Sequence, residues 1–138
     1  MEKISVGHVI LPNKPLNNFE LMDAAKQLKI KHFRGVFLRD TLPKRPKKNE
    51  CGIINLDDSS GTGSHWCCYW IDGDKKYYFD SYGLPPPLEL IEYLKPGILY
   101  NTLQVQPAGS VVCAHLSLYI LNELNKGRDF QDVINDLY

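Results

Sequence analysis

Two short segments rich in aromatic and aliphatic side chains, His65–Ile71 and Tyr77–Asp80, flank the dipeptide Asp72–Gly73. Asp-Gly is a strong signal for the tight turn of a β-hairpin, so the sequence predicts two antiparallel strands here. This hairpin constrains the chain more than any other feature of the sequence, because its register determines which distant positions become neighbours.

The register of the hairpin places two titratable residues together. If Ile71 faces Lys76, paired positions keep a constant sum, and position 80 falls opposite position 67. Side chains two positions off register remain within reach of one another. We therefore expect His65 and Asp80 at the same edge and on the same face of the hairpin. In such a pair the carboxylate fixes the tautomer of a histidine that serves as a general base.

A cysteine stands at the start of a strongly apolar predicted helix. Cys113 opens a run that continues to Leu121, after a predicted turn at Pro107–Gly109, and Ser110 is the expected N-cap. A helix N-terminus lowers the pKa of a thiol and makes it a better nucleophile. Gln106 lies seven residues before Cys113. With the histidine–carboxylate pair, these residues predict a cysteine hydrolase, in which the thiolate attacks, the imidazole transfers the proton and the amide donates to the oxyanion.

The remaining patterns predict an α+β fold with a mixed or antiparallel central sheet flanked by helices. Residues 1–16 include prolines at 12 and 15 and are expected to form an extended arm. The predicted helices run from Asn17 or Asn18 to about Leu28, over Leu88–Leu94, from Ser110 to about Asn125 and from Asp129 to Leu137; the further predicted strands are Phe33–Leu38, Cys51–Leu56 and Ile98–Gln106. A chain of 138 residues, 43% of them hydrophobic, fits a single domain over residues 1–138.

Several segments carry a resemblance to a known family. They are Phe33–Phe37, Glu50–Leu56, Gly61–Trp66 and Tyr78–Gly83, with Gln106 seven residues before Cys113. In this order they resemble the adenovirus-type (adenain) maturation proteases, in the clan that includes the proteases that process ubiquitin-like proteins. The resemblance implies a single protease domain of the papain-like cysteine protease superfamily. Its His-Asp-Gln-Cys order is circularly permuted relative to papain-like enzymes, in which the nucleophile comes first.

The resemblance also implies roles for individual residues. His65, Asp80 and Cys113 would form the catalytic triad. Gln106 and the backbone N–H of the nucleophile would form the oxyanion hole. Trp66 would help to bound the substrate channel, and a place in the core is an equally good interpretation of this residue.

The activity implied by the resemblance is that of a cysteine endopeptidase. It would cleave structural precursor proteins (capsid precursors) of a virus, virophage or virus-like transposon after Gly, during particle maturation. The protein would act in the virion and in the host-cell interior, in the cytoplasm or a virus factory, and would not be secreted. An alternative enzyme activity is deconjugation of ubiquitin-like modifiers. A non-catalytic peptide-binding module is the alternative from a different class.

The chain departs from the family pattern in two places. Related proteases carry glycine after the nucleophile, whereas this chain has Ala114, which we expect to lie at the substrate-binding site and to affect rate and specificity. A cysteine is missing from the segment Lys95–Val105, where a disulfide-linked activating peptide could attach. Its absence argues against that form of control.

Other polar residues are weaker candidates for the site. Gln104 lies two positions before Gln106 and on the same predicted strand face, and only the resemblance favours Gln106. His115 lies two residues after the nucleophile, which places it roughly 200° around the helix and predicts packing on the far side. Asn55 precedes the predicted loop Asp57–Gly63 and Asp57 begins it, and both residues are expected to take part in turn chemistry.

Composition argues against several other classes. The net charge is zero, so whole-molecule attraction to nucleic acid is not indicated, and the cluster Lys44–Lys48 is expected to be a solvated loop, with a nucleic-acid contact as the minor hypothesis. Cys67 and Cys68 would point to opposite faces of a strand and pack there, and no zinc-ligand spacing occurs. No segment is long and apolar enough to span a bilayer, and a secretory signal is absent. We expect a monomer in a reducing compartment that acts on polypeptides without a metal or organic cofactor.

Overall fold

The computed structural model describes residues 3–57, 60, 65–106 and 110–137. Its strands and helices follow one another as β1 (Lys3–Val6), β2 (Val9–Pro12), α1 (Asn18–Gln27), β3 (Phe33–Leu38), β4 (Asn49–Asn55), β5 (Trp66–Asp72), β6 (Lys75–Phe79), α2 (Leu88–Leu94), β7 (Leu99–Tyr100), α3 (Cys113–Asn125) and α4 (Phe130–Asn135). The predicted turn Pro107–Gly109 and most of the predicted loop Asp57–Gly63 lie outside the described residues.

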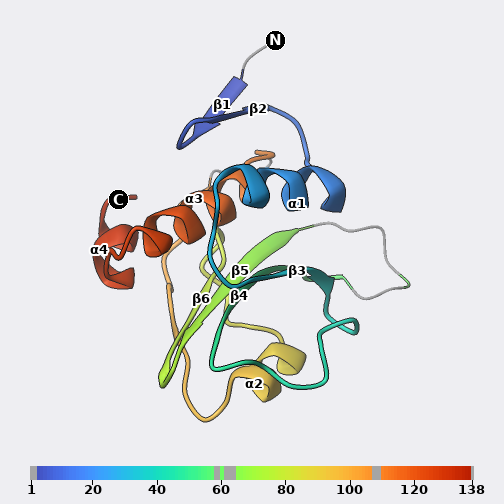
Figure 1. Ribbon diagram of the computed structural model, residues 1–138, viewed down its shortest axis with the longest axis vertical. Coiled ribbons are helices and arrows are strands. Elements are labelled where there is room, and N and C mark those ends of the chain that lie inside the picture. The colour runs from blue at the N-terminus through green and yellow to red at the C-terminus, as the bar shows by residue number, and fades with distance from the viewer. Residues whose placement is uncertain (1–2, 58–59, 61–64, 107–109, 138) are drawn as a thin grey trace.

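A five-stranded mixed sheet forms the centre of the fold, with strand order β3-β4-β5-β6-β7. The pairs β4–β5 and β5–β6 are antiparallel, whereas β3 and β7 pair parallel to their neighbours. The helices α1 and α3 cover one face of the sheet and α2 covers the other (Figure 1). The predicted α+β class and the mixed sheet flanked by helices are confirmed. The predicted hairpin register is confirmed as well, because Ile71 pairs with Lys76.

Two hydrophobic clusters hold the layers together, one on each face of the sheet. The first joins the sheet to α1, α3 and α4 and includes Leu21 and Leu118, and the second, under α2, includes Leu90. Neighbouring side chains of β5 alternate between the clusters, since Cys68 belongs to the first and Cys67 to the second. The prediction that these two cysteines point to opposite faces is therefore confirmed, and both thiols are buried.

Helix α1 begins where its cap predicts. The side chain of Asn17 accepts a hydrogen bond from the N–H of Glu20 (2.9 Å), and the Glu20 carboxylate accepts one from the N–H of Asn17 (3.0 Å). This reciprocal capping box satisfies two N–H groups that the helix itself leaves unpaired. The cap lies directly after Leu16, so it also fixes the chain that enters the helix.

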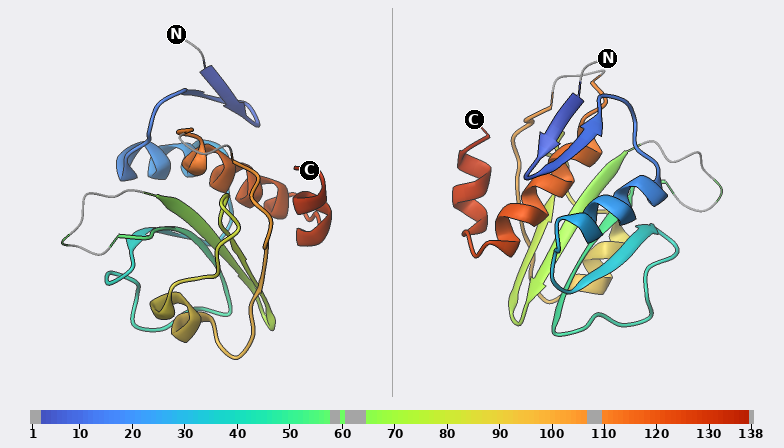
Figure 2. Two further views of the ribbon diagram at one scale, coloured as in Figure 1. Left: turned by 180° about the vertical axis from the view of Figure 1, so that it is seen from behind. Right: turned by 45° about the horizontal axis from the view of Figure 1, so that its top comes forward.

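The predicted extended arm over residues 1–16 is instead a β-hairpin. Strands β1 and β2 pair antiparallel, and Val6 and Val9 are buried. Gly7, between the strands, has φ +57°, and a Cβ at this position would meet side chains of Asn122 and Leu28 at 3.0 Å. The hairpin thus lies against α3 as a separate two-stranded sheet (Figure 2). The prolines led to the wrong prediction. Pro12 does not exclude a strand here, because a proline can occupy the last position of an edge strand.

The predicted strand Ile98–Gln106 is wrong beyond residue 100. Only Leu99 and Tyr100 join the sheet, parallel to β6. The Asn101 side chain replaces the hydrogen bonds that a longer β7 would make to Asp80, because it accepts from the N–H of Asp80 (3.0 Å) and donates to the C=O of Asp80 (2.7 Å). These bonds satisfy the Asp80 backbone, so the residues after Asn101 need not continue the strand.

The basic cluster forms a loop, as predicted, and a buried carboxylate holds it. Glu50 accepts hydrogen bonds from the N–H of Lys47 (2.8 Å), the Arg34 guanidinium (2.8 Å) and the Tyr93 hydroxyl (2.6 Å). Burial by itself raises the pKa of Glu50, but these hydrogen bonds and one from Tyr69 lower it on balance.

Among the described residues, no helix has the length and apolar character needed to cross a membrane.

We expect the substitution Asn17→Ala to lower the free energy of unfolding by about 1 kcal/mol, because the N-cap bond is lost. Thermal unfolding followed by circular dichroism should show a midpoint lowered by about 3–5 °C. The matched control is Asn18→Ala, at the exposed first position of α1, which should change the midpoint much less. Equal shifts in the two variants would contradict the role of the cap.

Candidate active site

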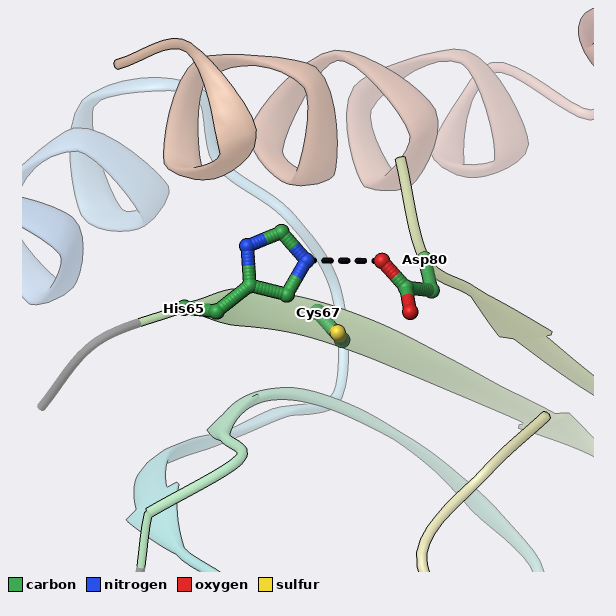
Figure 3. A group of neighbouring side chains, drawn as sticks. All are labelled: His65, Cys67 and Asp80. Atoms are coloured by element: carbon green, nitrogen blue, oxygen red, sulfur yellow. Dashed lines mark hydrogen bonds and ion pairs between the residues drawn. The ribbon is translucent and has the colours of Figure 1, made fainter. Parts of the chain in front are cut away.

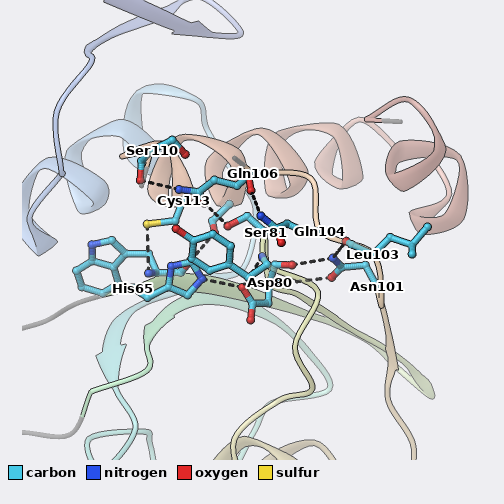
Figure 4. Close-up of polar contacts among 12 residues, drawn as sticks. His65, Asp80, Ser81, Asn101, Leu103, Gln104, Gln106, Ser110 and Cys113 are labelled. Atoms are coloured by element: carbon cyan, nitrogen blue, oxygen red, sulfur yellow. Dashed lines mark hydrogen bonds and ion pairs between the residues drawn. The ribbon is translucent and has the colours of Figure 1, made fainter. Parts of the chain in front are cut away.

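The predicted histidine–carboxylate pair is present at the end of the β5–β6 hairpin. His65 immediately precedes β5 and Asp80 immediately follows β6, and Nε2 of His65 lies 2.7 Å from Oδ1 of Asp80 (Figures 3 and 4). Both side chains are buried. The hairpin register thus brings together two residues that are 15 positions apart in the sequence.

Further contacts hold this pair in place. Asp80 Oδ1 also accepts from the backbone N–H of Tyr82 (2.9 Å). The Tyr82 ring stacks on the His65 imidazole, with ring centroids 4.7 Å apart. The imidazole is therefore fixed at its edge by the carboxylate and on its face by the tyrosine, and Nδ1 is left to face the cysteine.

Cys113 is the first residue of α3, and its thiol is partly exposed. Its Sγ accepts from the backbone N–H of Trp66 (3.5 Å). The helix begins with Val112 as its N-cap and without a side-chain cap, so the predicted N-cap Ser110 is wrong. The backbone C=O of Ser110 instead accepts from the Gln106 side chain (2.9 Å), and the helix starts at the cysteine.

The interaction between Cys113 and His65 favours a thiolate–imidazolium pair. Burial alone lowers the pKa of His65, but hydrogen bonds to Asp80 and to Cys113 outweigh it and raise the pKa to about 9. Burial alone raises the pKa of Cys113, but the hydrogen bond to His65 and the backbone N–H groups of Trp66 and Ala114 lower it on balance. The raised pKa of the imidazole and the lowered pKa of the thiol both favour transfer of the proton from Cys113 to His65.

Gln106 lies beside His65 and Cys113, in an irregular segment that follows β7. The backbone N–H groups of Val105 and Gln106 both donate to the C=O of Ser81 (2.8 and 3.1 Å). The Ser81 hydroxyl donates to Oε1 of Gln106, while Nε2 of Gln106 donates to the C=O of Ser110. A carbonyl only accepts, so these two contacts fix which end of the amide is the NH₂ group. One hydrogen on Nε2 remains for a ligand beside Cys113.

A cavity of about 410 Å³ opens over these groups. His65, Gln106 and Cys113 line it, together with Leu16 and Trp66. A second cavity of about 660 Å³ shares the wall of Leu16 and Trp66 and extends to β3, an edge strand of the sheet. The two cavities form adjoining hollows along one side of the molecule.

The structure places the other candidates as follows. Trp66 is compatible with both a place in the core and a place at the substrate channel. It is partly buried against the first hydrophobic cluster, and it also lines both cavities. Ala114 is buried in that cluster and is not part of the cavity lining, so its side chain lies away from the substrate position expected for it. His115 donates to the C=O of Pro12 (2.8 Å) on the far side of α3, as expected from its spacing.

The rival polar residues stay out of the site. Gln104 is exposed and does not line the cavity that contains Gln106. Asn55 accepts from the N–H of Asp57 (2.9 Å), which is the turn chemistry predicted for this pair.

Sequence reasoning missed three residues that support the site: Ser81, Tyr82 and Asn101. Two of them directly follow the aspartate, and their contacts with Gln106 and His65 depend on the conformation of that turn. Asn101 has no local signal, because its partner is the backbone of Asp80, 21 positions away. The adjacency of Ser81 and Tyr82 to a candidate acid was the one available indication.

The described residues also contain a set of donors that could hold a metal ion. One ligand atom each from His65, Cys67 and Asp80 lies within 4.8 Å of the others, and all three residues are buried (Figure 3). The set shares the histidine and the aspartate with the candidate catalytic group.

Comparison with known proteins supports the fold. No protein-family model matches the chain, and no curated protein sequence does. Two crystal structures of the ASFV pS273R protease, one of them the Se-Met form, match with TM-scores of 0.62 and 0.59. In each case the sequence identity is 19%, and the match covers 89% of this chain and 62% of the other. This chain thus spans less than two thirds of the length of the protease that it matches.

This chain therefore shares its fold with the ASFV pS273R protease. The TM-scores establish the shared fold, whereas an identity of only 19% leaves activity to be argued from the site.

We expect iodoacetamide to alkylate Cys113 selectively at pH 7, because its pKa is lowered while burial raises the pKa of Cys51, Cys67 and Cys68. The substitution His65→Ala should move the rise of the alkylation rate to higher pH and slow the reaction about tenfold or more at pH 7. Mass spectrometry of the modified peptide over a pH series measures this. The exposed His8 provides the control His8→Ala, and equal rates in the two variants would count against the ion pair.

Proposed function

We propose that this protein is a cysteine endopeptidase. The observation that carries the proposal is the convergence of Cys113, His65 and Gln106 on one cavity, with Asp80 bonded to the far nitrogen of the histidine. A structural cysteine would need neither a lowered pKa nor an imidazole held by a buried carboxylate.

The geometry supports a conventional acyl-transfer sequence. The Cys113 thiolate attacks the scissile carbonyl carbon, and the oxyanion accepts hydrogen bonds from Nε2 of Gln106 and the N–H of Cys113. His65 then gives its Nδ1 proton to the leaving amine, and a thioester remains on the sulfur. Water, deprotonated by His65, hydrolyses the thioester and restores the thiolate. Asp80 holds the ring throughout and stabilises its cationic form.

The two adjoining cavities support a polypeptide as the substrate. An extended chain seated at Cys113 can pass Leu16 and Trp66 and continue beside the edge strand β3. An edge strand offers free backbone groups to such a chain. Trp66 donates its indole N–H to the C=O of Leu16 (2.9 Å), which holds the shared wall in place.

The finer specificity rests on the resemblance to adenain-type proteases. We propose cleavage after Gly, in structural precursor proteins of a virus, virophage or virus-like transposon, during particle maturation. The protein would then work in the virion and in the host-cell interior. The fold shared with a protease of ASFV is consistent with this setting.

The direct test uses peptides that contain Gly at the cleavage position and matched peptides with Val there. Wild type should cleave the Gly peptides at least tenfold faster, and Cys113→Ala should be inactive, as measured by mass spectrometry of the products. Equal processing by wild type and Cys113→Ala would refute the catalytic role. Selective cleavage of fluorogenic ubiquitin-like substrates would favour the deconjugase instead.

The oxyanion role of Gln106 can be tested against its sequence neighbour. Gln106→Ala should lower kcat by about 10²–10³ and leave KM nearly unchanged, because the lost hydrogen bond is made mainly in the transition state. Gln104→Ala, two positions away and exposed, should change kcat by less than about threefold. A similar loss in both variants would show that the segment, not the amide, matters.

A further inference from the structure

We propose that His65, Cys67 and Asp80 form a binding site for a thiophilic divalent cation such as Zn²⁺, and that an ion bound there switches the hydrolase off. The binding claim stands on the geometry of the three side chains. The claim of inhibition rests on the proposed function, because His65 and Asp80 are also its catalytic pair.

The three donors meet at one point under the active-site cavity. Their ligand atoms lie within 4.8 Å of one another, and Figure 3 shows the Cys67 sulfur below the gap between the imidazole and the carboxylate. Asp80 is fully buried, and its Oδ2 has no hydrogen-bond partner among the described residues. A buried carboxylate oxygen without a partner is costly, and a cation would satisfy it.

The backbone fixes this arrangement. His65 directly precedes β5, Cys67 is the second residue of β5, and Cys68 pairs with Phe79, so position 80 falls opposite position 67. The ligands therefore come from β5 itself and from the two residues that directly adjoin β5 and β6. Cys68, the next residue, lies in the other hydrophobic cluster and cannot contribute.

The exchange of protons for the ion conserves charge. Before binding, the group comprises the Cys67 thiol, the His65 imidazolium and the Asp80 carboxylate, with a net charge of zero. A divalent cation displaces the proton of the thiol and the Nε2 proton of the imidazolium, and both leave to solvent. The thiolate, the neutral imidazole, the carboxylate and the cation again sum to zero, so the buried site gains no net charge.

The donor set selects the type of ion. One nitrogen, one sulfur and one carboxylate oxygen suit Zn²⁺, Co²⁺ or Cd²⁺, whereas Mg²⁺ and Ca²⁺ require several oxygen ligands. An ion bound to Nε2 displaces the proton that Nε2 donates to Oδ1 of Asp80, so binding has to break the His65–Asp80 hydrogen bond, which now spans 2.7 Å.

Loss of the hydrogen bond between His65 and Asp80 would inhibit the hydrolase. With the ion on Nε2, the imidazole can no longer receive a proton there or keep the cationic form that supports the Cys113 thiolate. Catalysis and metal binding thus exclude each other at His65. Because the ion has to displace the proton of the Cys67 thiol, binding should weaken as the pH falls.

Binding is tested first without activity. Co²⁺ added to the Cys113→Ala protein, which lacks the nucleophile, should produce the near-ultraviolet charge-transfer band of a Co²⁺–thiolate bond. The band should disappear when Cys67→Ser is added and persist when Cys68→Ser is added, with folding of each variant checked by circular dichroism. Cys67→Ala serves as a second variant in case the serine protein is unstable. No band in the parent protein, or a band that survives loss of Cys67, would overturn the proposal.

Inhibition is tested with the cleavage assay. Zn²⁺ should inhibit wild type and Cys68→Ser alike, and EDTA should restore activity. Cys67→Ser should require at least a tenfold higher Zn²⁺ concentration for half-inhibition. Equal inhibition of both variants would show that Zn²⁺ binds the Cys113–His65 pair instead and would overturn the switch. An inactive wild type would count against the proposed function, whereas the Co²⁺ band decides the metal site independently.

Discussion

The antiparallel register between β5 and β6 is the constraint on which the site depends. It sets Asp80 one step beyond the end of β6 and His65 one step before β5, where their 2.7 Å contact forms. A slip of one residue would turn every side chain of one strand to the other face, so the two hydrophobic clusters enforce the contact between His65 and Asp80 as well as the fold. Packing and chemistry are therefore specified by the same hydrogen-bonded ladder.

The turn after β6 links the hairpin to the other residues of the site. Asp80 binds the edge of the imidazole, Ser81 binds the side chain and backbone of Gln106, and Tyr82 stacks on the face of the histidine ring. Three consecutive residues thus contact His65 and Gln106. Asn101 secures this turn through both backbone groups of Asp80, which explains why the chain leaves the sheet immediately after β7.

Local signals predicted the parts of the fold that local physics determines. The Asp72–Gly73 turn gave the hairpin and its register, and the Asn17 cap gave the start of α1. The wrong predictions involve hydrogen bonds that a propensity for one residue does not include. Ser110 is a good N-cap residue in isolation, but its carbonyl is bound by Gln106, and α3 starts three residues later. The choice between Gln104 and Gln106 likewise required the resemblance, because alternation places both on one strand face.

The wall formed by Pro15 and Leu16 belongs to a part of the chain that carries none of the reacting groups. It is attached to the remainder through the indole of Trp66 and, further back, through His115 and the carbonyl of Pro12. Substitutions in this wall can alter which sequences are accepted while the proton-transfer apparatus keeps its geometry. Substrate selectivity and turnover rate can therefore change independently during evolution, since the residues that determine them lie in different segments of the chain.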